Sequence, residues 1–180
     1  MSEKFKFNDT SGIYFITPTI SSWIDLFTKS EYCEIILDSL RYCQKEKGLL
    51  IHSWCIMPSH LHLIISALNK NHADIIRDFK TFTSKKITDQ IKSGHDSRKE
   101  WLIRLFGEEA MKSNRKEKYK VWQNGNHPVQ LDTNVMIEER LNYIHDNPVK
   151  AEYVYKAEDY VYSSAFDYAD GKGLLEIVRL

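Results

Sequence analysis

Two short apolar runs on either side of a Met-Pro-Ser turn are the clearest hydrophobic pattern in the chain. They span residues 49–54 and 60–66 and are rich in aliphatic and β-branched residues. Two such runs separated by a turn signal predict a β-hairpin. A similar run, Tyr14–Ile20, predicts a first strand, and Pro18 marks an edge or an irregularity in it because proline has no backbone N–H.

Two segments that flank this hairpin carry apolar residues at helical spacing. Thr28 and Glu31 form a capping-box pattern at the start of the first segment, and Gly48 ends it. Asn71 is an expected cap of the second segment, which runs from about Ala73 to Lys92. The exposed side of that second helix is basic, which is typical of a solvated face and also suits a local patch for a polyanion; its cations are Arg77, Lys80, Lys85, Lys86 and Lys92.

The second half of the chain contains an insertion and a third helix. Residues 93–120 are mostly hydrophilic, with one apolar run, and predict an amphipathic helical insertion followed by a mobile charged loop. Residues 119–123 predict a short strand. The third helix should begin near residues 132–134 and end at Asn147, because the following proline disfavours helical backbone before it. Residues 160–178 are expected to pack back on the sheet.

Composition limits the class of protein. The chain has 180 residues without repeats, low-complexity segments or linkers, so we expect a single domain over residues 1–180, with the insertion at about 93–120. The formal net charge is zero, so no global field draws the protein to a polyanion. Three cysteines without Cys-x-x-Cys spacing, no apolar span long enough for a membrane, and no signal-peptide core predict a cytoplasmic protein with reduced thiols.

The second strand of the predicted hairpin carries a candidate metal site. Successive side chains of a strand point to opposite faces, so His60 and His62 share one face while Leu61, Leu63 and Ile65 share the other. Two imidazoles on neighbouring positions of one face can hold a divalent cation at a separation that the strand fixes.

The third predicted helix carries a second chemical segment. Tyr143 and Asn147 are four residues apart and therefore lie one above the other on the helix. Leu141 and Ile144 face the core, so Tyr143 should project away from it, where the ring could lie over the histidine pair. His145 points to another side of the helix and is left out of the site.

These two segments together carry a resemblance to a known family. His60-Leu61-His62, followed by the run from Tyr143 to Ala151, resembles the single-tyrosine HUH transposases, close to the REP-associated tyrosine transposases and the insertion-sequence-200-like enzymes. The similarity extends from about Tyr14 to Tyr168. It implies an α+β, ferredoxin-like fold, with helices packed on a central antiparallel sheet.

The resemblance also implies an activity and its residues. Such enzymes cut single-stranded or hairpin DNA through a covalent 5′-phosphotyrosine, which leaves a free 3′-OH for strand transfer. Carried over to this sequence, Tyr143 is the nucleophile, and His60, His62 and Asn147 are ligands of Mg²⁺ or Mn²⁺. A phenol ionises only near pH ~10, so it needs such activation at neutral pH. The rejoining step needs no ATP, because the phosphotyrosine bond conserves the phosphodiester energy.

The same resemblance sets expectations for location and assembly. The protein is expected in the cytoplasm, associated with the nucleoid. Relatives act either as monomers or as homodimers that exchange the tyrosine helix, so both states stay open, and the insertion at about 93–120 is either a DNA-contacting arm or a solvated loop. The change His62→Ala is expected to leave the fold intact, on the premise that His62 is a surface ligand.

Three alternatives remain open at this point. A histidine-triad nucleotide hydrolase needs a third histidine at the next alternate strand position, where Ile64 stands. A two-motif phosphoesterase needs a second His-x-Ser/Thr strand, which the segments around His52 and His127 do not supply. The third alternative is a domesticated, catalytically silent module that binds hairpin DNA.

Overall fold

A four-stranded antiparallel sheet lies at the centre of the protein. The computed structural model describes residues 7–68, 71–113 and 117–180. The strands are β1 (Tyr14–Ile16), β2 (Leu49–Met57), β3 (His60–Ala67) and β4 (Val129–Gln130), in the spatial order β2-β3-β1-β4. Every pairing is antiparallel. This order, with helices between β1 and β2 and between β3 and β4, is the ferredoxin-like arrangement predicted.

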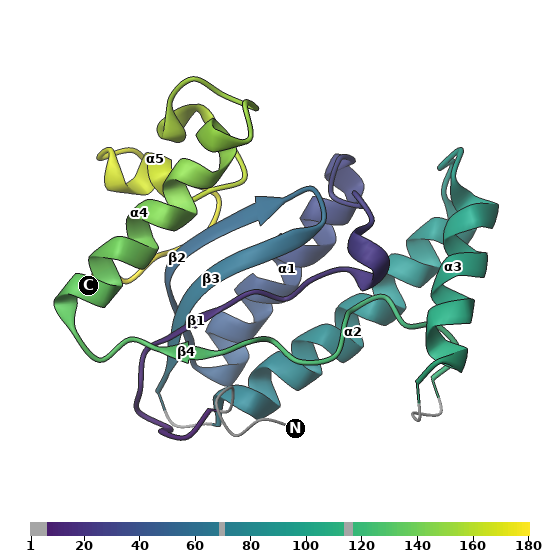
Figure 1. The fold of residues 1–180 in the computed structure, drawn as a ribbon, viewed down its shortest axis with the longest axis horizontal. Coiled ribbons are helices and arrows are strands. Elements are labelled where there is room, and N and C mark those ends of the chain that lie inside the picture. The colour runs from purple at the N-terminus through teal and green to yellow at the C-terminus, as the bar shows by residue number, and fades with distance from the viewer. Residues whose placement is uncertain (1–6, 69–70, 114–116) are drawn as a thin grey trace.

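Helices cover both faces of the sheet (Figure 1). The larger core joins α1 (Ser30–Lys47) and α2 (His72–Ser93) to one face, whereas a smaller cluster joins the other face to α4 (Asn134–Lys150). Because the sheet is covered on both sides, β2 is buried at eight of its nine positions and shows no polar alternation. The face under α4 is the one that carries the histidine pair, since Phe15 and Ile64 of the smaller cluster share it.

The tip of the β2–β3 hairpin is a two-residue turn, Pro58-Ser59, which neighbouring segments hold by backbone hydrogen bonds. Ile20 N–H donates to the Ser59 carbonyl at 2.9 Å, and Phe27 N–H donates to the Pro58 carbonyl at 2.9 Å. The Leu61 N–H donates to the Pro18 carbonyl at 2.9 Å. The segment that follows β1 therefore fixes the point where β3 begins.

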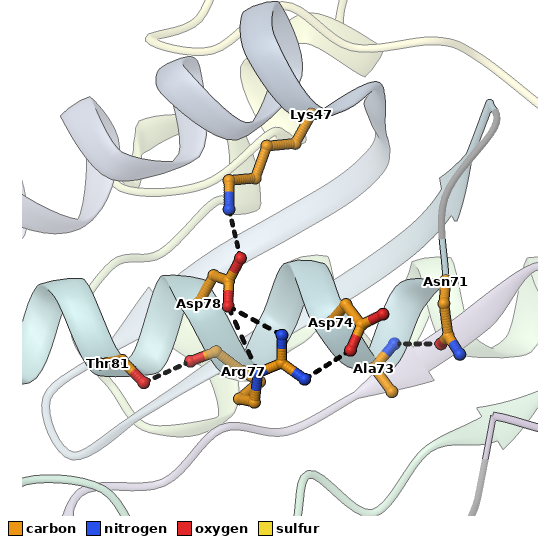
Figure 2. A network of polar contacts seen from close by, with 7 residues as sticks. All are labelled: Lys47, Asn71, Ala73, Asp74, Arg77, Asp78 and Thr81. Carbon is orange, nitrogen blue, oxygen red and sulfur yellow. Dashed lines mark hydrogen bonds and ion pairs between the residues drawn. The ribbon is translucent and has the colours of Figure 1, made fainter.

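Helix α2 begins where the sequence predicts (Figure 2). The Asn71 side chain accepts a hydrogen bond from the Ala73 N–H at 2.8 Å, as an N-cap does. Arg77 is held by Asp78 and by a second carboxylate one turn earlier, and Asp78 also accepts from Lys47 at the end of α1. The Lys47–Asp78 pair ties the two helices together, and both Arg77 and Lys47 are neutralised within the fold.

Two sequence predictions at the start of the chain are wrong. The strand predicted over Tyr14–Ile20 is regular only to Ile16; beyond Pro18, isolated bridges at residues 19 and 20 replace it. Thr28 does not cap α1, because its hydroxyl donates to the Asp25 carbonyl, and the N-cap position is Lys29 without a side-chain cap.

Two further predictions fail in the second half. Residues 119–123 form no strand; Trp122 makes one isolated bridge with Ile20, and the fourth strand is Val129–Gln130. Helix α4 does not end at Asn147 but continues through Pro148 to Lys150. The Ala151 N–H still donates to the Asn147 carbonyl at 2.9 Å, so the proline removes one donor from the last turn without ending the helix.

The insertion contains the predicted helix, α3 (Lys99–Met111), which buries Leu102 and Phe106 in the larger core. Part of the predicted mobile loop, residues 114–116, lies outside the described residues, as does the N-terminal stretch 1–6. The tail packs back on the sheet as predicted, where the Val178 N–H donates to the Ile51 carbonyl at 2.9 Å.

The remaining helical elements are short: α5 (Ala165–Tyr168) and two 3₁₀ turns, η1 (Ser21–Trp23) and η2 (Ala157–Asp159). All three cysteines are free and buried. Among the helices in the described parts of the chain, none combines the length and the apolar character that a bilayer span requires.

Candidate metal and nucleophile site

The imidazoles of His60 and His62 face each other at the start of β3. Their Nε2 atoms are 3.1 Å apart, and the rings meet nearly edge to face. Both side chains point to the α4 face of the sheet, because they occupy alternate positions of one strand. The pairing of these two residues, predicted from the sequence, is therefore present in the structure.

The other nitrogens of the two rings are held by hydroxyl groups. His60 Nδ1 lies 3.1 Å from Ser59 Oγ, and His62 Nδ1 lies 3.3 Å from Thr17 Oγ1. When each Nδ1–H donates to its hydroxyl, both Nε2 atoms keep a free lone pair, as metal ligation through Nε2 requires. Without a cation, the same geometry suits one Nε2–H donating to the other.

The separation of the two nitrogens fits a divalent cation. Adjacent corners of an octahedron with bonds of about 2.1 Å lie ~3.0 Å apart, close to the observed 3.1 Å. In the described residues, no cluster of three or more His, Cys, Asp or Glu side chains is arranged to hold a metal ion. A cation here would therefore take its remaining ligands from an amide, water or the substrate.

Electrostatics keep the pair neutral. Burial lowers the pKa of His60, and it lowers the pKa of His62 to about 3, where the positive charges of His60 and Arg140 add to the effect. Both imidazoles are consequently uncharged at neutral pH, with lone pairs free for a cation.

The ring of Tyr143 lies against His62 of the same chain. The two ring centres are 5.2 Å apart, and the Tyr143 ring also meets Phe15 edge to face at 6.1 Å. The tyrosine is 40% exposed, so its ring faces away from the core as predicted. One polypeptide thus brings together the phenol and the histidine pair without a second subunit.

Sequence reasoning missed Arg140, which lies one turn before Tyr143 on α4. Its guanidinium stacks over the Phe15 ring at 5.1 Å and lies 5.9 Å from the centre of the Tyr143 ring. Within the described residues no carboxylate pairs with Arg140, unlike Arg77 on α2. Its spacing of three residues from Tyr143 was the available signal, because such positions adjoin on a helix.

Asn147 and His145 have different surroundings. Asn147 is half-buried, and its side-chain amide donates to the Tyr143 carbonyl at 3.3 Å, so it lies on the Tyr143 side of α4. His145 is buried between sheet and tail, with Nε2 at 2.9 Å from Ser164 Oγ and 3.2 Å from Ser53 Oγ. His145 therefore belongs to the packing of α4, as its position on the helix indicated.

The premise that His62 is a surface ligand is wrong. His62 is only 3% exposed, because α4 lays Tyr143 across it and Phe15 stacks on its ring at 5.6 Å. His62→Ala would consequently open a cavity as well as remove a ligand. A polar replacement of similar size, such as glutamine, separates the two effects better.

A groove of about 760 Å³ lies between α2 and residues 117–128. Its lining includes Lys85, Lys92 and Lys118 together with the rings of Tyr119 and Trp122. Lys92 stacks over Tyr119 at 4.3 Å. None of the histidine pair or Tyr143 lines this groove, so the basic face predicted on α2 is a surface distinct from the His–Tyr site.

Comparisons with known proteins agree with this fold. The family model described as transposase IS200 like matches residues 23–109, a range that contains the histidine pair and ends before α4. A solved REP-associated tyrosine transposase bound to a REP hairpin is 16% identical, with a TM-score of 0.67 over 100% of this chain and 95% of that one.

A second solved structure, a transposase from Deinococcus radiodurans R1, is 13% identical with a TM-score of 0.47, over 81% of this chain and 97% of that one. The search of curated protein sequences gave no match. Residues 23–109 therefore resemble the IS200-like transposase domain, and the whole chain shares the fold of the REP-associated tyrosine transposase.

Proposed function

We propose that this protein is an HUH-type single-strand DNA transposase that cuts and rejoins DNA through a covalent 5′-phosphotyrosine at Tyr143. The observation that carries the proposal is the contact between the Tyr143 ring and His62, whose Nε2 lies 3.1 Å from that of His60. A phenol, a pair of neutral imidazoles and an unpaired guanidinium are the groups that such a phosphoryl transfer needs.

In the proposed reaction, the Tyr143 oxygen attacks the scissile phosphorus. A new O–P bond to the tyrosine forms while the bond from phosphorus to the 3′-oxygen breaks, and the proton lost by the phenol balances the proton gained by the 3′-OH. Arg140 binds a phosphate oxygen and stabilises the negative charge of the transition state. Attack by a 3′-OH on the phosphotyrosine reverses the step and joins strands.

His60 and His62, with the side-chain oxygen of Asn147, would hold Mg²⁺ or Mn²⁺. A bound divalent cation polarises the phosphate and offsets the charge that develops on it. Ser59 and Thr17 orient the two imidazoles through their Nδ1 atoms. The substrate would be single-stranded or hairpin DNA. The protein would act in the cytoplasm, in association with the nucleoid.

Covalent capture tests this function. A panel of hairpin oligonucleotides with single-stranded tails, labelled at the 3′ end, is incubated with protein and Mn²⁺ and then denatured. We expect labelled protein from wild type, none from Tyr143→Phe, and wild-type amounts from the control Tyr153→Phe, another exposed tyrosine. The same strands labelled at the 5′ end should instead release a labelled fragment with a 3′-OH.

Equal adducts from wild type and Tyr143→Phe, or none across the panel, would reject the catalytic proposal. Hairpin binding that persists in that case would favour the silent DNA-binding module. Hydrolysis of a nucleotide phosphoramidate or cyclic phosphodiester that survives Tyr143→Phe would favour a histidine-dependent phosphoesterase.

A further inference from the structure

An exposed indole stands beside the histidine pair. Trp23 is 60% exposed, and its ring meets His60 edge to face with the centres 5.6 Å apart. By contrast, Trp54 and Trp122 are buried in the core. A single exposed aromatic residue is unremarkable by itself, so the case for Trp23 depends on its position and on its backbone.

The backbone at Trp23 is strained. Ser22 and Trp23 have φ angles of 58° and 55°, two consecutive left-handed residues of which neither is glycine. Such conformations cost free energy in L-residues and persist where the surroundings hold them, often at functional sites. The strained backbone directs the indole outward beside His60. The residues before and after the turn, Ile20 and Leu26, are by contrast fully buried.

Helix α3 and the segment after it hold this turn. Ser22 Oγ donates to Glu109 of α3 at 3.2 Å, and Ser21 N–H donates to the Val121 carbonyl at 2.8 Å. Arg98, at the start of α3, donates to the Asp25 carbonyl at 2.9 Å. The insertion and the segment after it thus hold the turn, which explains how a strained conformation is maintained.

We propose that Trp23 is the stacking platform for a nucleobase of single-stranded DNA next to the scissile phosphate, and that the α3 insertion keeps it in place. The proposal rests on the proposed function, which puts the scissile phosphate at the histidine pair. Trp23 contacts His60 directly, so a base on the indole would belong to a nucleotide whose phosphate reaches that pair. Every base has a π-face, so the indole would contribute affinity with little sequence preference.

Fluorescence provides a test that does not depend on activity. In EDTA, where cleavage is blocked, a tailed hairpin oligonucleotide is titrated into the full-length protein. We expect quenching of tryptophan emission in wild type and in Trp101→Phe, a control indole on α3 that is 40% exposed, and loss of that quenching in Trp23→Phe. Trp23→Ala should weaken binding by roughly 10-fold, and Trp23→Phe, which keeps a ring, should restore most of it.

A 2-aminopurine base moved along the tail then locates the contact. We expect Trp23-dependent quenching of the analogue only beside the bond that is cut when Mn²⁺ is added. The proposal is overturned if Trp23→Ala binds DNA as wild type does, if quenching survives Trp23→Phe, or if Trp23→Ala instead changes the mass of the protein under dilution, which would mark a surface covered by a second copy.

The two proposals fail separately. Trp23-dependent binding without any covalent adduct would reject the transposase chemistry and retain the stacking platform for bound DNA. If wild type and Trp23→Ala form the adduct at equal rates and bind DNA with equal affinities, the stacking platform would be rejected and the transposase chemistry retained.

Discussion

The guanidinium of Arg140 lies 5.9 Å from the centre of the Tyr143 ring, one turn before it on α4. Arg140 also stacks on Phe15, which in turn stacks on His62. Arg140, which has no carboxylate partner among the described residues, is thereby held at the same side of the sheet as the proposed nucleophile and the candidate metal ligand. A phosphate bound between these groups would meet positive charge from the helix and from the strand.

We expect Arg140→Ala to slow adduct formation by about 100-fold, because it removes a donor aimed at developing phosphate charge. Arg140→Lys should recover part of the rate, since it keeps the charge without the fork of donors. Single-turnover adduct formation at saturating DNA measures this effect, and Arg104→Ala on α3 is the matched control. An unchanged rate in Arg140→Ala would remove Arg140 from the reaction.

The Thr17 hydroxyl, which contacts His62 Nδ1, provides a second test of the site. Thr17→Val keeps the side-chain shape but removes the partner of His62 Nδ1, so Mn²⁺ affinity should fall by roughly 10-fold. His62→Gln should weaken it further, whereas Thr28→Val, an exposed threonine elsewhere, should not change it. Titration calorimetry with Mn²⁺ measures these affinities, and equal binding by all four proteins would exclude the histidine pair as the metal site.

His145 makes stability depend on pH. Burial lowers its pKa from 6.5 to about 4. Between these two pH values the imidazole is protonated in the unfolded chain and neutral in the folded protein. Its stabilising contribution is therefore complete above pH 6.5 and decreases as the pH falls towards 4, by roughly 3 kcal/mol in all. Urea unfolding at pH 7, 5.5 and 4 should show a shallower pH dependence for His145→Gln than for wild type, while His95→Gln, at the surface, should follow wild type.

Asp96 anchors the start of the insertion. Although burial opposes its ionisation, hydrogen bonds from Arg98 and from Tyr32 hold its pKa well below the usual range. Asp96→Asn should lower the free energy of unfolding by about 3 kcal/mol, because Arg98 is left without its charge partner. A fall in Tm of roughly 10 °C is expected, against almost none for Asp38→Asn, which forms an exposed ion pair with Arg41.

The groove beside α2 predicts that the affinity for DNA depends on the salt concentration. If single-stranded DNA tracks along it, Lys85 and Lys118 each neutralise a phosphate, and the double change to alanine should reduce the slope of log affinity against log salt by about 1.4. Lys156→Ala, at an exposed position away from the groove lining, is the control. An unchanged slope would assign the DNA path to another surface.

The sequence predicted the hairpin and its histidine face because side chains alternate between the two faces of a strand, so residues two positions apart must share a face. It predicted α2 and its Asn71 cap because the cap is a local interaction. The predicted end of α4 at Asn147 was wrong because a proline in the last turn costs a single hydrogen bond. The packing of Ile144 and His145 against the sheet offsets that cost.

Other features depend on contacts distant in sequence. Thr17 meets His62 across 45 residues, and Ser22 meets Glu109 across 87, so no local pattern reveals either contact. The left-handed turn at Trp23 has no glycine to mark it. Sequence reasoning therefore identified His60, His62 and Tyr143, which the structure brings together, and it missed Thr17 and the turn at Trp23 beside them.

In the described part of the chain, Tyr143 is the one tyrosine whose ring contacts the histidine pair. Under the proposed chemistry, a phenol that carries a 5′ end stays occupied until that end is handed to an acceptor. One molecule can then hold a single DNA end at a time, so excising an element with two borders requires either consecutive rounds by one protein or a second protein at the other border.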